Sequence, residues 1–129
     1  MSKKIVLGVI GRQKIGNWKI PQKIQTAICH IAANSMKEKI SFMVTEYHQS
    51  SGIPNLLKYL RSNKKSIKKI FFVSIFQLGK KKNEVIQNYN KIKKYNCYFF
   101  TESIYNRSKN IRQINNFVKF VFKLKYYQK

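Results

Sequence analysis

The feature that most constrains the fold is a regular alternation of short apolar runs with segments whose apolar residues recur at helical spacing. This alternation is typical of β-α-β units, in which parallel strands are joined by helices. The apolar runs predict strands at residues 4–10, 40–45, 70–76 and 97–101. The segments between them predict helices from Pro21 to about Lys37, after Pro54 and over 85–92. We therefore expect a three-layer α/β domain with a mostly parallel, four-stranded sheet and flanking helices.

Each predicted helix has an apolar face that should pack on the sheet. The residues of these faces are Ile20, Ile24, Ala27, Ile28, Ile31 and Ala32 in the first helix, Leu56, Leu57 and Leu60 in the second, and Val85, Ile86, Tyr89 and Ile92 in the third. Pro21 suits the first turn of the first helix, because a backbone N–H is not needed there.

The 129-residue chain is of the size of one domain. We divide it into an α/β domain at 1–105 and a basic C-terminal helix at 106–129, which carries apolar side chains on one face only. That helix either packs on the sheet or extends as a basic arm toward a membrane surface, a nucleic acid or a partner helix. Its long apolar face also makes a homodimer plausible.

Charge is the strongest compositional signal, since 27 Lys and Arg residues against 4 Asp and Glu give a net charge of +23. A basic surface attracts polyanions without regard to sequence, so we expect non-specific polyanion binding. The lysines are spread over every segment and arginines are few, a pattern that AT-rich coding bias also produces. Coding bias with a solvated surface and a functional polyanion partner both remain open as explanations.

Two cysteines point to a reducing compartment. Cys29 falls on a predicted helix and Cys97 at the start of a predicted strand, and neither belongs to a metal-ligand or CxxC spacing. Both are predicted to be buried thiols. No apolar run is long enough to span a bilayer, and the first strand lacks a cleavage pattern, so we expect a cytoplasmic protein without a membrane span.

Ligands of open α/β sheets bind beyond the carboxyl ends of the strands, and several polar residues occupy those positions. Arg12, Glu46, His48, Gln77 and Glu102 each follow a predicted strand. A glutamate there either forms an ion pair with Arg12 or acts as an acid, base or hydroxyl acceptor. We take Glu46, Glu102 and His48 as candidate catalytic residues, with a surface position as the alternative for His48.

Other signatures of catalysis are missing from the sequence. It contains no GxGxxG, Walker loop, GxSxG or HExxH motif and no aspartate. We therefore expect neither a metal nor a cofactor, and the residues leave open whether the chain catalyses a reaction.

The order of these motifs resembles the catalytic domain of the serine recombinases, the resolvase and invertase family. Arg12 follows the first strand, Glu46 is followed by Ser51-Gly52, and Phe76-Gln77-Leu78-Gly79-Lys80 follows the third strand. The family has a nucleophilic serine two residues after its first arginine, where this chain has Lys14, and arginines where it has Gln77 and Lys80. The resemblance implies the resolvase-like fold, without recombinase activity, because the nucleophile is lacking. A non-catalytic DNA-binding protein is one function it suggests.

The chain is also similar to the sporadic carbohydrate cluster proteins, which are encoded among genes for bacterial surface carbohydrates. Its matching motifs are Gly11-Arg12, Pro21-Gln22 with Gln25, Thr45-Glu46-Tyr47 and the run 72–78, although only two residues separate Gln22 from Gln25. This resemblance implies an accessory protein or enzyme of polysaccharide or lipopolysaccharide biosynthesis. The implied ligand-binding residues are Arg12, Gln22, Gln25, Glu46 and Gln77, and the implied ligand is a phosphorylated sugar or nucleotide sugar.

Overall fold

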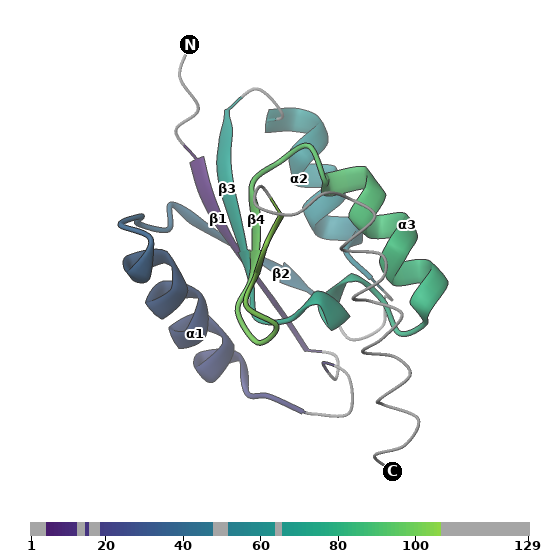
Figure 1. Cartoon of the computed structure of the whole chain (residues 1–129), viewed down its shortest axis with the longest axis horizontal. Coiled ribbons are helices and arrows are strands. Elements are labelled where there is room, and N and C mark those ends of the chain that lie inside the picture. Colours follow the sequence, from purple (N-terminus) through teal and green to yellow (C-terminus); the bar gives the residue numbers. More distant parts are fainter. Residues whose placement is uncertain (1–4, 13–14, 16–18, 48–51, 64–65, 107–129) are drawn as a thin grey trace.

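A computed structural model of the chain describes residues 5–12, 15, 19–47, 52–63 and 66–106. Its elements follow one another as β1 (Ile5–Gly11), α1 (Gln22–Ser35), β2 (Phe42–Glu46), α2 (Pro54–Asn63), β3 (Ile67–Phe72), the 3-10 helix η1 (Ile75–Leu78), α3 (Lys82–Ile92), β4 (Cys97–Phe99) and β5 (Ile104–Tyr105). The sheet has the strand order β2-β1-β3-β4-β5, with α1 on one side and α2 and α3 on the other (Figure 1). The predicted three-layer α/β class is confirmed.

The sheet is mostly parallel, as predicted, but it has five strands instead of four. β2, β1, β3 and β4 run parallel, whereas β5 pairs antiparallel with β4 through Tyr98 with Tyr105 and Phe99 with Ile104. The fifth strand is only two residues long, which is too short for an apolar pattern to reveal it.

Alternate residues of the central strand β1 pack into two separate cores. Leu7 and Val9 face α2 and α3, in a cluster that also contains most of the buried side chains of those helices. Val6 and Ile10 face α1, in a cluster with Phe71 of β3. β1 is buried on both faces, as expected of a central strand in a parallel sheet.

The buried face of α1 differs from the predicted one. The helix buries Gln25, Cys29, Ala32 and Ala33, whereas Ile24 is 51% exposed and Ile31 58% exposed. The small side chains let the helix backbone approach the sheet closely. The Gln25 side chain forms hydrogen bonds with the backbone at the end of β1. The predicted faces of α2 and α3 are confirmed, with Leu56, Leu60, Val85, Tyr89 and Ile92 all buried.

The third strand ends earlier than predicted. The apolar run continues to Phe76, but the strand stops at Phe72 and Ile75–Leu78 form η1. The cause is a capping box, in which the Ser74 side chain accepts from the Phe76 N–H and the Gln77 side chain accepts from the Ser74 N–H.

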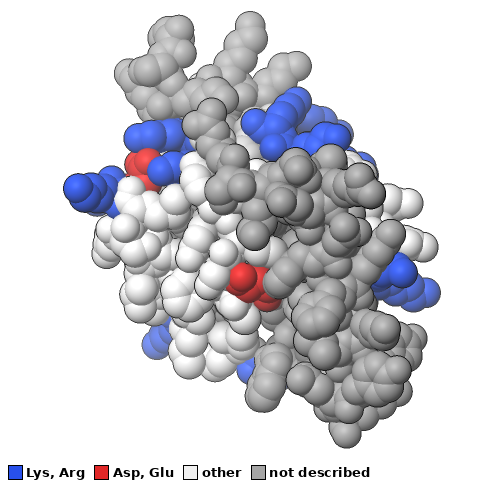
Figure 2. Space-filling view, in the orientation of Figure 1, with Lys and Arg blue, Asp and Glu red and all other residues white. Residues whose placement is uncertain are grey.

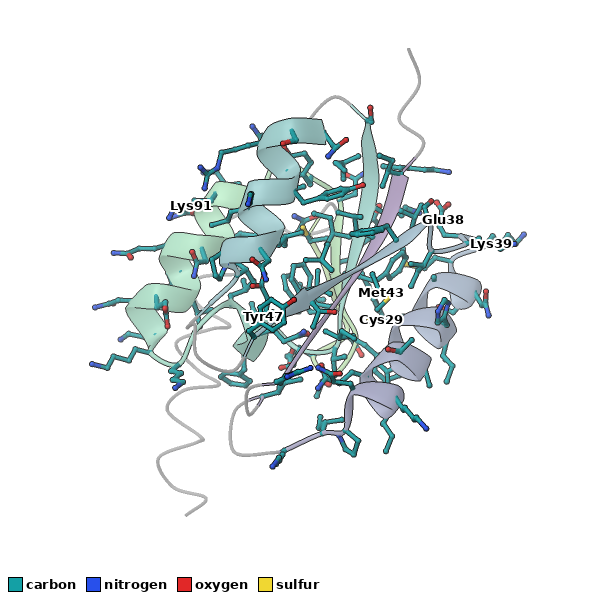
Figure 3. The ribbon with its side chains drawn as sticks, turned by 180° about the vertical axis from the view of Figure 1, so that it is seen from behind. Cys29, Glu38, Lys39, Met43, Tyr47 and Lys91 are labelled. Carbon is teal, nitrogen blue, oxygen red and sulfur yellow. The ribbon has the colours of Figure 1, made fainter. Side chains whose placement is uncertain are left out.

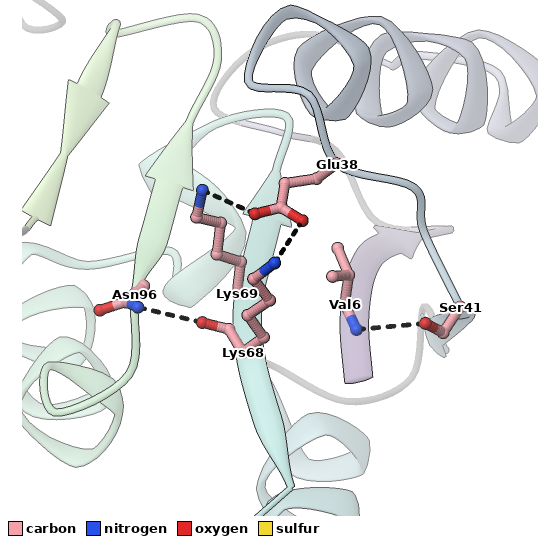
Figure 4. Close-up of polar contacts among 6 residues, drawn as sticks. All are labelled: Val6, Glu38, Ser41, Lys68, Lys69 and Asn96. Carbon is pink, nitrogen blue, oxygen red and sulfur yellow. Dashed lines mark hydrogen bonds and ion pairs between the residues drawn. The ribbon is translucent and has the colours of Figure 1, made fainter. Parts of the chain in front are cut away.

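Salt bridges hold the amino end of the sheet. Glu38, in the connection from α1 to β2, pairs with Lys68 at 3.0 Å and Lys69 at 2.9 Å, both on β3 (Figure 4). At the same end, the Asn96 side chain donates to the Lys68 carbonyl and the Val6 N–H donates to the Ser41 hydroxyl (Figure 4). One acidic residue thus forms ion pairs with two lysines.

Both cysteines are buried and unpaired, as predicted. Burial raises the pKa of the Cys29 thiol to about 12, and it raises the pKa of Cys97 as well. Within the described part of the chain, no helix is long and apolar enough to cross a membrane. The predicted C-terminal helix, with its apolar face for a homodimer, falls on residues 107–129 apart from its first residue, outside the described residues, and the division at 105/106 stays a prediction.

Candidate functional site

The predicted polar residues gather at the carboxyl ends of the strands. Arg12 directly follows β1, and its backbone N–H donates to the carbonyl of Glu46 at the end of β2 (3.1 Å). Gln77 of η1 reaches the same end, since its Nε2 donates to the carbonyl of Val9 in β1 (2.8 Å). Glu102 contacts the segment after β3. We call this edge the rim; His48 lies outside the described residues.

Gln25 is fully buried at the rim, and its side-chain amide forms hydrogen bonds with backbone groups. Its Oε1 accepts from the Gly11 N–H (2.9 Å), and its Nε2 donates to the carbonyls of Gly11 (2.8 Å) and Ile20 (2.7 Å). The side chain therefore pairs the last residue of β1 in the way that another strand would. This arrangement favours a structural role, and ligand binding by Gln25 stays a prediction.

Glu46 binds the beginning of α2. Its side chain is nearly buried, and its two carboxylate oxygens accept from the N–H groups of Asn55 (3.0 Å) and Leu56 (2.8 Å). These N–H groups have no partner within the helix, so the carboxylate stabilises the N-terminus of α2. Burial raises the pKa of the Glu46 carboxyl, and the two N–H groups offset that effect in part.

Glu102 and Gln77 organise the turn that follows β3. Glu102 accepts from the Ser74 hydroxyl (2.8 Å) and the Ile75 N–H (2.6 Å). Gln77 Oε1 accepts from the N–H groups of Val73 (2.7 Å) and Ser74 (3.0 Å). Burial raises the pKa of the Glu102 carboxyl, against the opposing effect of its hydrogen bonds. The polar atoms of both side chains thus bind neighbouring parts of the protein.

The raised pKa values predict how stability changes with pH. A carboxyl whose pKa is higher in the folded state binds a proton more readily there. Its contribution to the free energy of unfolding is therefore fully present below the unfolded pKa and is lost as pH rises through the folded pKa. For Glu46 and Glu102 this loss falls above the ordinary glutamate value of 4.5. Glu38 behaves in the opposite way, because Lys69 and Lys68 lower the pKa of its carboxyl. Its contribution to the free energy of unfolding is lost as pH falls below 4.5.

We therefore expect the free energy of unfolding to decline less between pH 4.5 and neutrality in the Glu46→Gln, Glu102→Gln double variant than in the wild type. Urea denaturation at a series of pH values measures this. Both proteins keep the same histidines and lysines, so their contributions cancel in the comparison. Equal pH dependence in the two proteins would show that neither carboxyl has a raised pKa.

Arg12 differs from the other rim residues because its side chain is exposed. Its guanidinium lies 5.8 Å from the centre of the Tyr47 ring, a cation-π contact with a residue that is itself 54% exposed. Among the described residues, Arg12 forms no ion pair with either rim glutamate. Figure 3 shows Tyr47 well separated from Glu38, in keeping with their positions just after and just before β2.

An open pocket of about 610 Å³ adjoins Arg12 at the N-terminus of α1. Its lining includes Gly11, Arg12, Lys19, Ile20, Pro21 and Gln22. Gln22 is partly exposed, but its Nε2 atom is buried and has no hydrogen-bond partner. Since buried polar groups are nearly always paired, this donor is an exception among the described residues.

The start of α1 adds further donors to this pocket. Pro21 is the N-cap residue and gives no side-chain cap, and the first turn contains no acidic residue. The start of α1 therefore has no side-chain acceptor, although the Ile24 N–H donates to the Pro21 carbonyl (3.0 Å), and the positive end of the helix dipole lies at the pocket. Arg12 and Gln22 were predicted from the sequence, but Lys19 and the pocket were not. The available signal was a lysine two residues before Pro21, the N-cap residue of α1.

The described residues do not meet the requirements of a metal site. Within the described residues, no group of three or more His, Cys, Asp and Glu side chains is placed to hold a metal ion. The donors around the pocket are cationic or amide nitrogens, which suit an anion.

Comparison with known proteins shows the fold. The chain is similar to the crystal structure of the N-terminal catalytic domain of the TP901-1 integrase, with a TM-score of 0.68 and 12% identity over 98% of this chain and 99% of that one. It is also similar to a resolvase family site-specific recombinase from Streptococcus pneumoniae, with a TM-score of 0.66 and 11% identity over 96% of this chain and 89% of that one. The chain has the resolvase-like fold.

The comparisons give no support for the second resemblance. No family model matches the chain, and no curated protein matches it. The expected resolvase-like fold is thus confirmed, whereas membership of the sporadic carbohydrate cluster proteins is without support.

Proposed function

We propose that this protein binds a phosphate-bearing ligand in the pocket at the N-terminus of α1. The observation that carries the proposal is the grouping of Arg12 and Lys19 in one pocket with the start of α1, which has no side-chain cap. The first candidate ligand is a phosphorylated sugar or nucleotide sugar, which would make the protein a cytoplasmic accessory factor or enzyme of surface-carbohydrate biosynthesis.

The chemistry of the pocket supports an anion. An arginine can bind two phosphate oxygens at once, a lysine adds a point charge, and the N–H groups at a helix N-terminus donate hydrogen bonds to the same oxygens. No carboxylate belongs to the described lining, and the rim glutamates are bound to α2 and η1. The volume of about 610 Å³ lies in the range of small-molecule pockets, roughly 300–1,000 Å³.

Recombinase chemistry is not part of the proposal. The sequence has Lys14 where the resembling family has its nucleophilic serine. Gln77 stands at the position of one family arginine, and its amide binds Val73, Ser74 and Val9. Without an activated hydroxyl, the chain has no means of forming a covalent bond to phosphorus at that position.

Duplex DNA is the second candidate ligand. The resolvase-like fold and the net charge of +23 favour it. Lys and Arg side chains lie in separate groups around the face shown in Figure 2, with few acidic atoms visible between them. Site-selective binding with steep salt dependence would support the DNA hypothesis, whereas weak binding without sequence preference would reflect charge alone.

Thermal unfolding in the presence of UDP-glucose, glucose 1-phosphate or duplex DNA tests the proposal. A ligand at about 100 times its Kd stabilises the folded protein by about 2.7 kcal/mol, a shift of several degrees. We expect Arg12→Gln to weaken the binding of the stabilising sugar phosphate about tenfold, because a charge-assisted hydrogen bond pair is lost.

Lys39→Gln is the matched control, since it removes one exposed charge from the connection between α1 and β2, at the end of the sheet opposite the pocket. It should leave the Kd almost unchanged. If neither sugar phosphate raises the melting temperature, or if the two variants weaken binding equally, the proposed pocket is wrong.

A further inference from the structure

A second basic hollow lies between the C-terminal halves of α2 and α3. It has a volume of about 420 Å³, and its lining includes Leu57, Leu60, Arg61, Lys91, Lys94 and Tyr95. Figure 3 shows Lys91 on the α3 side of the molecule, where α2 and α3 lie side by side. None of these residues belongs to the rim or to the pocket at α1.

Three cations meet at this hollow without a carboxylate. Arg61 is in the last turn of α2, Lys91 is in the last turn of α3, and Lys94 follows α3. All three residues are exposed, and among the described residues none of them forms an ion pair. Three like charges around one hollow repel one another, so an anion placed among them is attracted by all three.

Side chains of the hydrophobic core contribute to the floor of the hollow. Leu60 is 4% exposed and Tyr95 is 5% exposed, and Leu57 packs against the same core. The Nζ atom of Lys94 lies 5.4 Å from the centre of the Tyr95 ring, a cation-π contact that keeps the lysine beside the hollow. A low-dielectric floor strengthens the attraction between the cations and a bound anion.

The hollow is separate from the pocket at α1. α2 begins at the rim, where Glu46 binds its N-terminus, and Arg61 is near its other end. α1 also lies on the opposite side of the sheet from α2 and α3 (Figure 1). One small ligand therefore does not reach both places.

We propose that this hollow is a second anion site that binds a phosphate group. Arg61 would form hydrogen bonds with two phosphate oxygens through its planar guanidinium. Lys91, in α3, and Lys94, in the turn after it, would attract the phosphate with their positive charges. The same chemistry fits the terminal phosphate of a small metabolite and the phosphodiester of a nucleic-acid strand, so the test includes both sources.

Calorimetric titration of the full chain at about 0.15 M salt, with pyrophosphate in one arm and a short oligothymidylate in the other, tests this site. The Lys91→Gln variant should weaken the binding of at least one probe about fivefold, as expected for one charge-assisted contact on an exposed side chain. Lys39→Gln removes the same charge on the other side of the molecule, as Figure 3 shows, and should change the Kd little. The Arg12→Gln variant removes a charge from the pocket at α1, so it shows whether the measured binding occurs in that pocket or in the hollow.

In the Arg12→Gln background, saturable binding that weakens with Lys91→Gln but not with Lys39→Gln supports the second site, and the arm in which it occurs gives the source of the phosphate. Equal weakening in Lys91→Gln and Lys39→Gln would show attraction by net charge and would overturn the proposal. The absence of saturable binding in both arms would also overturn it. Binding that depends only on Arg12 would leave the proposed function intact and refute the second site.

Discussion

Replacing Gln25 by leucine will lower the free energy of unfolding by about 3 kcal/mol, because it leaves buried backbone groups without partners. The lost contacts are those to the N–H and carbonyl of Gly11 and to the carbonyl of Ile20, all between 2.7 and 2.9 Å. Leucine has a similar volume, so a cavity contributes little. Urea denaturation of the two proteins at one pH measures the difference.

Gln22→Leu is the control for this prediction, since it makes the same chemical change three residues earlier in α1. The Nε2 of Gln22 is buried and unpaired, so its removal breaks no hydrogen bond made by that atom and we expect a change within about 0.5 kcal/mol. If the two variants lose equal stability, the hydrogen bonds of Gln25 do not hold the end of β1.

Replacing Glu46 by alanine should cost about 2 kcal/mol, the upper range for loss of a helix cap. The N–H groups of Asn55 and Leu56 lose their acceptor in a nearly buried position. Part of the loss is offset, because the variant no longer carries a buried charge at neutral pH.

The Glu46→Gln variant separates the effect of the carboxylate's charge from the effect of its acceptor oxygens. It keeps one acceptor oxygen and removes the charge, so we expect less than half of the loss in the alanine variant, measured by thermal and urea unfolding. If glutamine is as destabilising as alanine, the charge of Glu46 is essential to the start of α2. If both variants are as stable as the wild type, the carboxylate is not a structural cap.

Local patterns in the sequence predicted most of the fold. The apolar runs at β1, β2 and β4 and the faces of α2 and α3 depend on side-chain periodicity, which the sequence shows directly. The end of β3 was missed because the apolar run continues to Phe76, although Ser74 and Gln77 have the spacing of the capping box that begins η1. The contact of Glu102 with Ser74, from 28 residues further along the chain, could not be predicted from a local pattern. β5 was missed because two residues give no periodicity.

The roles of the rim residues were harder to predict than their positions. Parallel topology indicated that Arg12, Glu46, Gln77 and Glu102 would lie at one end of the sheet. Whether a polar atom faces solvent or a backbone group depends on tertiary contacts, such as Gln77 with Val9 across 68 residues. The apolar spacing in α1 favoured Ile24 and Ile31 as core residues, whereas the need to pair Gly11 places Gln25 there instead.

The central claim is that the rim side chains stabilise the fold while the N-terminus of α1 binds phosphate. Titration of isotope-labelled protein with pyrophosphate, followed by NMR of the backbone amides, tests it most directly. We expect saturable shifts at Gly11, Arg12 and residues 19–23 and a second group at Arg61, Lys91 and Lys94 from the proposed second site, with the amides of Asn55, Leu56 and Ile75 unchanged. Shifts of similar size at lysines over the whole surface, or shifts centred on Asn55 and Ile75, would contradict it.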